Sequence, residues 1–333
     1  MIQHGNRPHS TLRFGILGAA RIVPKGLIQP ASEVREIEIV AIASRDPARA
    51  REFATAHKIP EVLNTYAEVI SHPRLDAIYI PLPNSMHCEW SLRALRAGKH
   101  VLCEKPIACN AREAERMARV ADETGLILAE AFHYRHHPLA TRIKAVIESG
   151  VLGELLHLEA EFMAQIRPPN IRFQYELGGG ATMDLGCYPL NMLRHFSGSI
   201  PQVRRARAQV GPPGIDLSME ADFDLSGGAT ARMRCSMASA QVSVFFAARG
   251  ARGELSVTNP VAPQQGHVLT IQTAAEKSSE TILGDSSFVH QLRAFAAAIR
   301  GEQPIVTDAI EAVANMRLID EVYSAAGLSP RGL

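Results

Sequence analysis

A glutamate and a lysine stand side by side at the end of an apolar segment, HVLCEKP at residues 100–106. Burying a charge costs free energy unless the charge is paired or used. Glu104 and Lys105 therefore either form a structural ion pair or present the lysine to a ligand at the end of a strand. A lysine beside a bound alcohol could hold or exchange the hydroxyl proton.

A second stretch with chemical potential is LGGGATMDLGCYP, residues 177–189. Asp184 and Tyr188 are four positions apart, so a helix would place both on one face. The plain interpretation is an acid in the first turn of a helix and a tyrosine in the core. Gly186 inside a helix costs about 1 kcal/mol relative to alanine, and we expect a close approach of the backbone to a ligand to explain it.

The turn after the first apolar segment could bind a phosphate. GILGAARIV, residues 15–23, predicts a strand, a tight turn and a helix N-terminus, whose free N–H groups favour an anion. The dinucleotide fingerprint G-x-G-x-x-G is incomplete, because Ala20 and Val23 stand at its second and third glycines. A phosphate turn and an ordinary packing turn both stay open on this stretch. The candidate cofactor residues in it are Gly18, Ala19, Ala20, Arg21 and Ile22.

The end of the next apolar segment, ASRDP, bears on the choice of cofactor. An acidic residue there would bind the ribose 2′-hydroxyl of NAD, whereas an arginine suits the 2′-phosphate of NADP. Ser44 and Arg45 occupy the place, which favours NADP and leaves NAD open. Asp46 comes one residue late and is expected to cap the next helix. The alternative for Arg45 is a solvated surface charge.

A third polar cluster follows another apolar segment, in IPLPNSMH at residues 80–87. Ligands of open α/β sheets bind at the carboxyl ends of the strands. Alone, Asn84 is typical of a helix cap and His87 of a hydrogen-bonded core histidine. With the other two strand ends they predict a cofactor surface that includes Pro81, Leu82, Asn84, His87, Glu104 and Lys105.

The elements that position these residues change character near residue 135. Before it, apolar segments alternate with helical ones, which predicts a parallel sheet with helices on both faces. After it come long alternating runs that predict a large antiparallel sheet, one helical block and two terminal helices. The predicted fold class is α/β: a doubly wound Rossmann sheet, then a C-terminal α+β domain with a large, mostly antiparallel open sheet. The expected divisions are a flexible tail (1–11), a dinucleotide-binding domain (12–133) and a substrate-binding and oligomerisation domain (134–333).

Composition excludes several classes of protein. The 333 residues carry a net charge of +1, which gives no indication of nucleic acid or an acidic membrane as partner. No apolar stretch is long enough to span a bilayer. The five cysteines are odd in number and form no C-x-x-C motif, which predicts a reducing compartment and a cytoplasmic protein. His133, His136 and His137 have no partner ligands at a supporting spacing, so we expect no metal.

Together these motifs resemble the Gfo/Idh/MocA family of oxidoreductases over about residues 12–330. The resemblance is carried by GILGAARI, IPLPNSMH, CEKP, EAFHYRHHP and GGGATMDLGCYP. It implies hydride transfer between NADP or NAD and a carbon of a sugar, cyclic polyol or diol. It implies that Lys105 is the catalytic lysine and Asp184 its supporting acid. Tyr188 stands where many members have histidine, which resembles the glucose-fructose oxidoreductases, NADP-dependent xylose dehydrogenases and dimeric dihydrodiol dehydrogenases.

The resemblance also suggests roles for individual groups. We expect Tyr188 to exchange the substrate proton while Lys105 polarises the same oxygen, and the reverse assignment stays open. Partial burial and the nicotinamide cation should lower the pKa of Lys105, which in turn should lower that of Tyr188. Glu104 should help place the lysine. Arg135 is expected at the cofactor, Tyr134 and Arg172 at the substrate, and Phe173 and Tyr175 in the same substrate loop.

The sequence leaves two alternative functions open, and it also suggests that the chain forms an oligomer. The chain could keep its cofactor bound through both half-reactions, like glucose-fructose oxidoreductase or the NAD-dependent glycosidases, although residues 1–11 are short for a segment that clasps it. It could instead be a non-catalytic dinucleotide sensor, against which the retained Lys105, Asp184 and Tyr188 argue. The family's open sheet often forms the oligomer interface, and QVSVFFAA (241–248) suggests an apolar exposed face. We therefore expect a homodimer or homotetramer.

Overall fold

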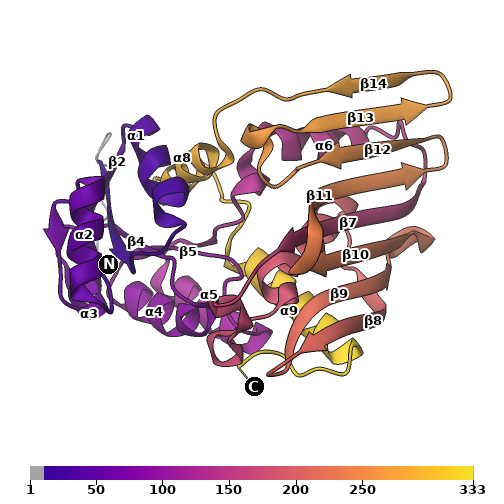
Figure 1. The fold of residues 1–333 in the computed structure, drawn as a ribbon. Helices are drawn as coiled ribbons and strands as arrows, with labels where there is room; N and C mark the ends of the chain where they lie inside the picture. Colours follow the sequence, from indigo (N-terminus) through magenta and orange to yellow (C-terminus); the bar gives the residue numbers. More distant parts are fainter. Residues whose placement is uncertain (1–10, 333) are drawn as a thin grey trace.

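Two sheets of different type make up the described part of the chain, residues 11–332 of the computed structural model (Figure 1). The flexible tail expected over residues 1–11 lies outside this range, apart from Thr11. The first sheet lies with its helices at one side of the molecule, and the second sheet forms the other side. The predicted fold class is confirmed.

The first sheet is parallel and has the order β3-β2-β1-β4-β5-β6. The strand order reverses between β1 and β4, which is the switch point where doubly wound sheets bind ligands. Its strands are buried on both faces, as their continuous apolar segments predicted. They are β1 (Leu12–Leu17), β2 (Ile37–Ala43), β3 (Glu61–Val62), β4 (Ala77–Ile80), β5 (His100–Cys103) and β6 (Leu128–Glu130).

The helices between these strands begin and end where their capping residues indicate. Asp46 accepts hydrogen bonds from the amides of Ala48 and Arg49, so its predicted capping role is confirmed. Asn110 accepts from the Glu113 amide at 3.0 Å and starts α5. The helices are η1 (Pro24–Ile28, a π-helix), α1 (Gln29–Glu33), α2 (Pro47–His57), α3 (Tyr66–Ser71), α4 (Asn84–Arg96) and α5 (Ala111–Thr124).

The second sheet has the order β14-β13-β12-β11-β7-β10-β9-β8. Every neighbouring pair is antiparallel except β7 and β10, which run parallel. The strands are β7 (Leu155–Gln165), β8 (Gln202–Gly211), β9 (Ile215–Asp224), β10 (Thr230–Ser236), β11 (Ala238–Gly250), β12 (Gly253–Thr258), β13 (Val268–Thr273) and β14 (Lys277–Glu280).

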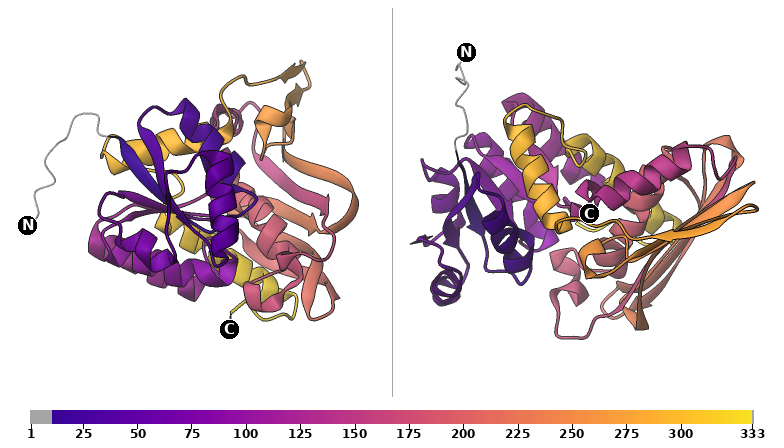
Figure 2. Two further views of the ribbon diagram at one scale, coloured as in Figure 1. Left: turned by 60° about the vertical axis from the view of Figure 1, so that its left-hand side comes forward. Right: turned by 90° about the horizontal axis from the view of Figure 1, so that it is seen from above.

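One face of this second sheet is covered and the other is open (Figure 2). Helices α6, α7 and α9 lie on the covered side, and α9 also packs against α5 of the first sheet. Helix α8 returns to the first sheet, where the Phe295 and Phe14 rings lie 5.7 Å apart. The remaining helices are η2 (His133–His136), α6 (Pro138–Glu148), η3 (Ile171–Phe173), η4 (Tyr175–Leu177), η5 (Thr182–Gly186, a π-helix), α7 (Cys187–Ser197), η6 (Ser226–Gly228), η7 (Pro263–Gln265), α8 (Ser287–Ile299) and α9 (Ala309–Ala325).

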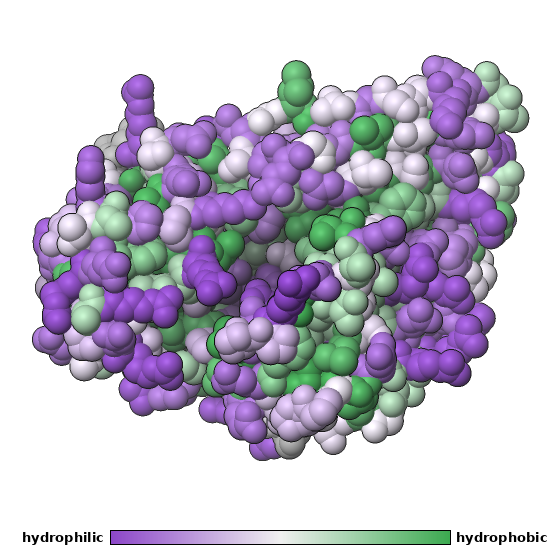
Figure 3. All heavy atoms as spheres, in the orientation of Figure 1, coloured by the Kyte–Doolittle hydropathy of each residue, from purple (hydrophilic) through white to green (hydrophobic). Residues whose placement is uncertain are grey.

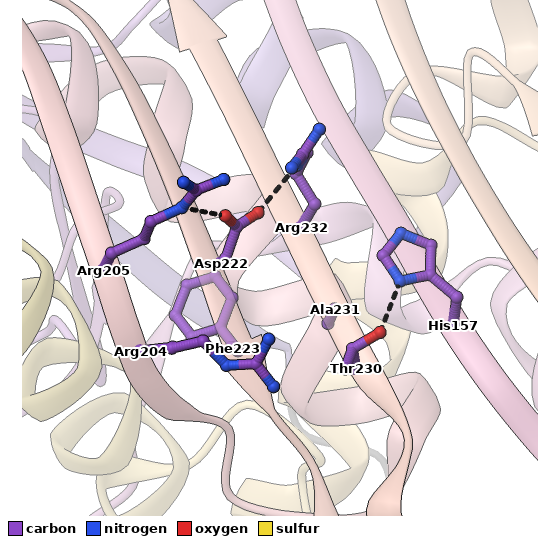
Figure 4. Close-up of a pocket in the computed structure, with 8 residues that line it drawn as sticks. All are labelled: His157, Arg204, Arg205, Asp222, Phe223, Thr230, Ala231 and Arg232. Carbon is purple, nitrogen blue, oxygen red and sulfur yellow. Dashed lines mark hydrogen bonds and ion pairs between the residues drawn. The ribbon is translucent and has the colours of Figure 1, made fainter.

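The open face of the second sheet is charged, and the expectation that it is largely apolar is wrong. In β11, Val244 and Phe246 pair with Phe162 and Ala160 of β7 and share their covered side. Only alternate residues of the 241–248 run therefore reach the open face. Cross-strand ion pairs occupy that face, and Figure 4 shows Arg205 of β8 and Arg232 of β10 both directed at Asp222 of β9.

No helix within residues 11–332 is both long enough and apolar enough to cross a bilayer.

Candidate active site

Lys105 and Asp184 come from different domains and meet at the carboxyl edge of the first sheet. Lys105 follows β5, and its Nζ donates to the backbone carbonyl of Asp184 at 2.7 Å and lies 3.3 Å from its carboxylate. The side chains of both residues are largely buried. The other carboxylate oxygen forms an ion pair with Arg172 at 2.5 Å. The structure thus brings three of the predicted residues into one cluster.

Tyr188 completes this cluster. The Lys105 ammonium nitrogen lies over the Tyr188 ring, 4.8 Å from its centre. Phe132 and Phe162 pack against the same ring at 5.3 and 5.5 Å, so Tyr188 is only 6% exposed. A cation over an aromatic face is an attractive arrangement, and it fixes the lysine close to the phenol.

The local geometry around Asp184 differs from the predicted helix. Residues Thr182–Gly186 form a π-helical turn that leads into α7, so Asp184 and Tyr188 span a change of helix type. We expected Gly186 to allow the backbone to approach a ligand, but its Cα faces a strand of the second sheet instead. A Cβ on Gly186 would lie 2.9 Å from the Cys235 sulfur, so this glycine permits the turn to pack against β10.

Burial and the neighbouring charges shift the pKa values of Lys105, Tyr188 and Asp184. Burial lowers the pKa of Lys105, but the Asp184 carboxylate outweighs it and holds that pKa above its ordinary value. Burial raises the pKa of Tyr188, and Lys105 only partly opposes this. For Asp184, burial is outweighed by Lys105 and Arg172, so its pKa is lowered. Without a cofactor both pKa values are therefore raised, and the lowering expected beside a nicotinamide cation stays a prediction.

Buried groups support the turn that carries Lys105. The Tyr79 hydroxyl donates to the Glu104 carboxylate at 2.6 Å. Glu130 is 2% exposed and accepts a hydrogen bond from the Ile107 amide at 2.8 Å. Tyr79 and Glu130 were not predicted, because only the pairing of β4, β5 and β6 brings them beside the lysine turn.

The residues predicted to hold a dinucleotide lie on the same edge of the sheet. Gly18 follows β1 with φ +99°, a conformation that favours glycine, and its amide donates to Ala43. Within residues 11–332, the amides of Ala19, Ala20 and Arg21 have no hydrogen-bond acceptor. A turn whose amides have no acceptor in this part of the chain fits a phosphate group.

Two arginines flank this turn. Arg45 follows β2 and is exposed, with Ser44 half-buried beside it. Arg49 was not predicted, and its guanidinium donates to the Ala19 carbonyl at 2.7 Å. No local signal marked it, because Arg45 precedes the cap of α2 whereas Arg49 lies inside that helix, and only the fold brings its guanidinium to the first turn. The pair fits a phosphate on the ribose of a dinucleotide.

The other candidates at the strand ends contact the protein itself. His87 is fully buried and lies within 2.9 Å of the carbonyls of Leu82 and Pro106, so it connects the two turns behind the proposed cofactor surface. Asn84 donates to the Gly178 carbonyl at 2.9 Å. It thereby joins α4 to residues 178–180, called the glycine segment below. Pro81 and Leu82 are buried below this edge. Direct cofactor contacts by these residues stay predictions.

Tyr134 and Arg135 lie where the chain crosses between the domains. The Tyr134 hydroxyl donates to the Asn191 side chain at 2.6 Å, and Arg135 pairs with Glu311. Both predicted residues are more than 90% buried. This placement supports a role in holding α7 in place, while their contacts with substrate and cofactor stay predictions.

The histidines of the crossing segment are engaged with neighbours. His133 stacks on Phe288 with ring centres 3.8 Å apart, and His136 lies 3.2 Å from the Thr307 hydroxyl. Burial lowers the pKa of both to about 3, so both are neutral. Residues 11–332 contain no group of three His, Cys, Asp or Glu side chains suited to a metal ion.

The space-filling view shows the molecule hollowed between its two sides, with apolar side chains beside the hollow (Figure 3). Arg172 is the partly exposed member of the charged cluster, with 39% of its side chain accessible. Phe173 and Tyr175 lie in the same loop and are half-buried. The arrangement can hold an oxygen-bearing substrate between an ammonium group, a phenol and a guanidinium.

Comparisons with known proteins agree with this arrangement. A model of the oxidoreductase family with an NAD-binding Rossmann fold matches residues 12–132, and one of the GFO/IDH/MocA C-terminal domain matches residues 140–256. The D-xylose 1-dehydrogenase (NADP(+)) 2 of Haloferax volcanii is 36% identical over 321 residues, which cover 95% of this chain and 97% of the relative. The dTDP-3,4-didehydro-2,6-dideoxy-alpha-D-glucose 3-reductase of Streptomyces antibioticus is 30% identical and covers 96% and 98%.

Solved structures show the same fold. A 3-ketoreductase from Actinomadura kijaniata in complex with NADP and TDP-benzene superposes with a TM-score of 0.88 at 29% identity, over 95% of this chain and 98% of that one.

Proposed function

The chain belongs to the Gfo/Idh/MocA family of oxidoreductases, and we propose that it transfers a hydride between NADP and a carbon of a sugar, cyclic polyol or diol. NAD is the second cofactor to test. One observation carries the proposal: Lys105, Asp184 and Tyr188 converge at the carboxyl edge of the dinucleotide-binding sheet. The named relatives act on sugars, which supports this class of substrate.

The residues of the cluster divide the work on the substrate oxygen. The nicotinamide, when bound, supplies or accepts the hydride. Lys105 has three N–H donors, of which two face Asp184, so one is left to polarise the oxygen. Tyr188 gives its proton to that oxygen in reduction and takes it back in oxidation. Asp184 stays ionised and holds the lysine charged.

The cofactor preference rests on the positive charges beside the first turn. Ser44, Arg45 and Arg49 offer one hydroxyl and two guanidinium groups where the ribose 2′-phosphate of NADP would lie. The free amides after Gly18 would hold the pyrophosphate. Arg172 and the half-buried aromatic residues of its loop would contact the substrate.

Assembly and location are part of the same proposal. We expect a homodimer or homotetramer through the open face of the second sheet, held by charged contacts. All five cysteines are free and buried, which supports a cytoplasmic protein. Sedimentation at low and at high salt tests the assembly. A dimer that weakens with salt supports it, and a monomer at both salts contradicts it.

Calorimetric titration with NADP⁺ and with NAD⁺ tests the cofactor assignment directly. We expect NADP⁺ to bind more tightly. Purified protein that already holds a cofactor it does not release would instead favour the bound-cofactor enzymes. Tight binding without turnover on any sugar or diol would favour a dinucleotide sensor.

A further inference from the structure

A second buried ion pair lies behind the active site, at the end of the described chain. Arg331 is 1% exposed, and its guanidinium lies 2.5 Å from the fully buried carboxylate of Asp216 on β9. The guanidinium also lies over the rings of Tyr323 and Tyr175, 4.4 and 4.7 Å from their centres. The Tyr323 hydroxyl donates to the same carboxylate at 2.9 Å.

Both members of this pair form hydrogen bonds to the segment that runs from the glycines to Asp184. Arg331 Nε donates to the Gly179 carbonyl at 2.8 Å, and Asp216 accepts from the Thr182 amide at 2.7 Å. The two bonds bracket Gly180, which has φ +135°. A Cβ on Gly180 would overlap the Asp216 carboxylate, so this position needs glycine because the pair lies against it.

This segment is hydrogen-bonded to Asp184 and Arg172 of the charged cluster. The Asp184 amide donates to the Gly180 carbonyl at 3.0 Å, and the Gly180 amide donates to the Arg172 carbonyl at 3.0 Å. Arg172 in turn pairs with Asp184. A shift of Gly180 would therefore move both Asp184 and its arginine partner.

The backbone of Arg331 also connects the two domains. The Arg331 carbonyl accepts from the Asn110 side chain at 2.8 Å, at the start of α5. Asn110 belongs to the domain that carries Lys105, whereas Asp216 belongs to the sheet domain. Arg331 is thus hydrogen-bonded to both bodies whose separation sets the contact between Lys105 and Asp184.

We propose that Arg331 and Asp216 are positioning residues for the reaction, which hold the glycine segment between the domains and thereby place Asp184 against Lys105. Stability alone is a weak reason for such a pair, because buried ion pairs can often be replaced by apolar groups without loss of stability. The kinetic part of this proposal rests on the proposed function. Its structural part does not.

The test compares Arg331→Met, Asp216→Asn and Arg331→Lys with the wild type. We expect kcat to fall by about 10²-fold in Arg331→Met, because small displacements of catalytic groups cost this much. Arg331→Lys should recover part of the loss, since it keeps the charge. NADP⁺ affinity should change much less than kcat, because the turn after Gly18 and Arg49, which would hold the phosphates, are bonded to neither Arg331 nor Asp216. Arg317→Met is the matched control, because Arg317 of α9 also bonds to α5, through Glu115 at the surface.

Hydrogen exchange supplies a readout that needs no substrate. In Arg331→Met and Asp216→Asn, the amides of Gly180, Thr182 and Asp184 should exchange faster, while those of β1 keep their protection. Normal kcat with only a lower melting temperature would overturn the proposal. So would unchanged exchange at these three amides. If Arg331→Met does not fold, Tyr323→Phe removes a single hydrogen bond to Asp216 and must show the same direction in kcat and exchange. A wild-type protein without turnover would contradict the proposed function. The exchange experiment would still test whether Arg331 and Asp216 hold the glycine segment.

Discussion

Lys105 and Asp184 are 79 positions apart in sequence, yet the lysine nitrogen lies 2.7 Å from the Asp184 carbonyl and 3.3 Å from its carboxylate. One residue extends from the dinucleotide-binding sheet and the other follows the glycine segment of the second domain. The contact therefore joins the two domains at the place where substrate and nicotinamide would meet. It also keeps an ammonium group charged although it is largely buried.

The first prediction concerns the two proton-bearing groups. Lys105→Met should lower kcat by about 10³-fold and Tyr188→Phe by about 10²-fold or more, because acid–base groups contribute roughly 10²–10⁴. Steady-state rates of NADPH formation and consumption measure both effects. Lys144→Met is a suitable control, since this half-buried lysine pairs with Glu148 on α6, away from the charged cluster. Full turnover in Tyr188→Phe, with none in Lys105→Met, would rule out the tyrosine as the proton carrier.

The second prediction uses Asp184→Asn to expose the electrostatics of the site. The Asp184 carboxylate raises the pKa of Lys105 against the effect of burial. Without that charge, burial and the nearby Arg172 both act to lower the lysine pKa. The high-pH limb of kcat/KM for reduction should therefore move to lower pH in the variant. A pH profile that keeps its shape and only drops in height would show that Asp184 does not tune the lysine.

The sequence predicted those parts of the site that neighbouring residues in the chain mark, and not those that depend on tertiary packing. The strand ends at Gly18, Arg45 and Lys105 were predictable, because apolar segments and turn residues mark them along the chain. Their convergence followed from the parallel sheet. The π-helical turn at Asp184 and the contact of Gly186 with Cys235 could not be predicted, since both depend on packing against β10.

The open face of the second sheet shows the same limit. The run QVSVFFAA contains the apolar residues of both faces, and only the pairing of β11 with β7 shows which of them are covered. Arg331 gave no local signal, because its partner Asp216 lies 115 positions away.

The third prediction concerns cofactor selectivity. Arg45→Ala and Arg49→Ala should each weaken NADP⁺ binding by roughly 10- to 100-fold, because a hydrogen bond to a charged group contributes about 1.5–3 kcal/mol. NAD⁺ binding should change little, since NAD⁺ lacks the 2′-phosphate. Calorimetry on both variants measures this, with Arg51→Ala on the same helix as the control. An equal loss for both cofactors would assign the arginines to the pyrophosphate instead.

The fourth prediction links Glu130 to the pH dependence of stability. Burial raises the pKa of Glu130 to about 8, although the hydrogen bond from Ile107 opposes this. An unfolded glutamate titrates near 4.3, so the folded state binds this proton more tightly. The resulting stabilisation is complete below about pH 4 and is lost as the pH rises to about 8. Its full size is of the order of a few kcal/mol, at about 1.4 kcal/mol per tenfold change in proton affinity.

Glu130→Gln keeps the acceptor for the Ile107 amide and removes the ionisation. Its melting temperature should therefore fall less than that of the wild type between pH 6 and pH 9. Thermal unfolding across this range is the measurement, and the exposed Glu123→Gln is the control. Parallel curves for wild type and Glu130→Gln would show that Glu130 does not bind its proton more tightly in the folded state.

The most direct test of the central claim follows reduced-nicotinamide absorbance when the wild type and Lys105→Met are mixed with NADP⁺ and a panel of aldoses, cyclic polyols and trans-diols. We predict that at least one compound gives NADPH with the wild type and that the same compound gives at least about 10²-fold less with Lys105→Met. Equal rates in the two proteins, or no NADPH from any compound although NADP⁺ binds, would contradict the assignment of a lysine-dependent hydride transfer.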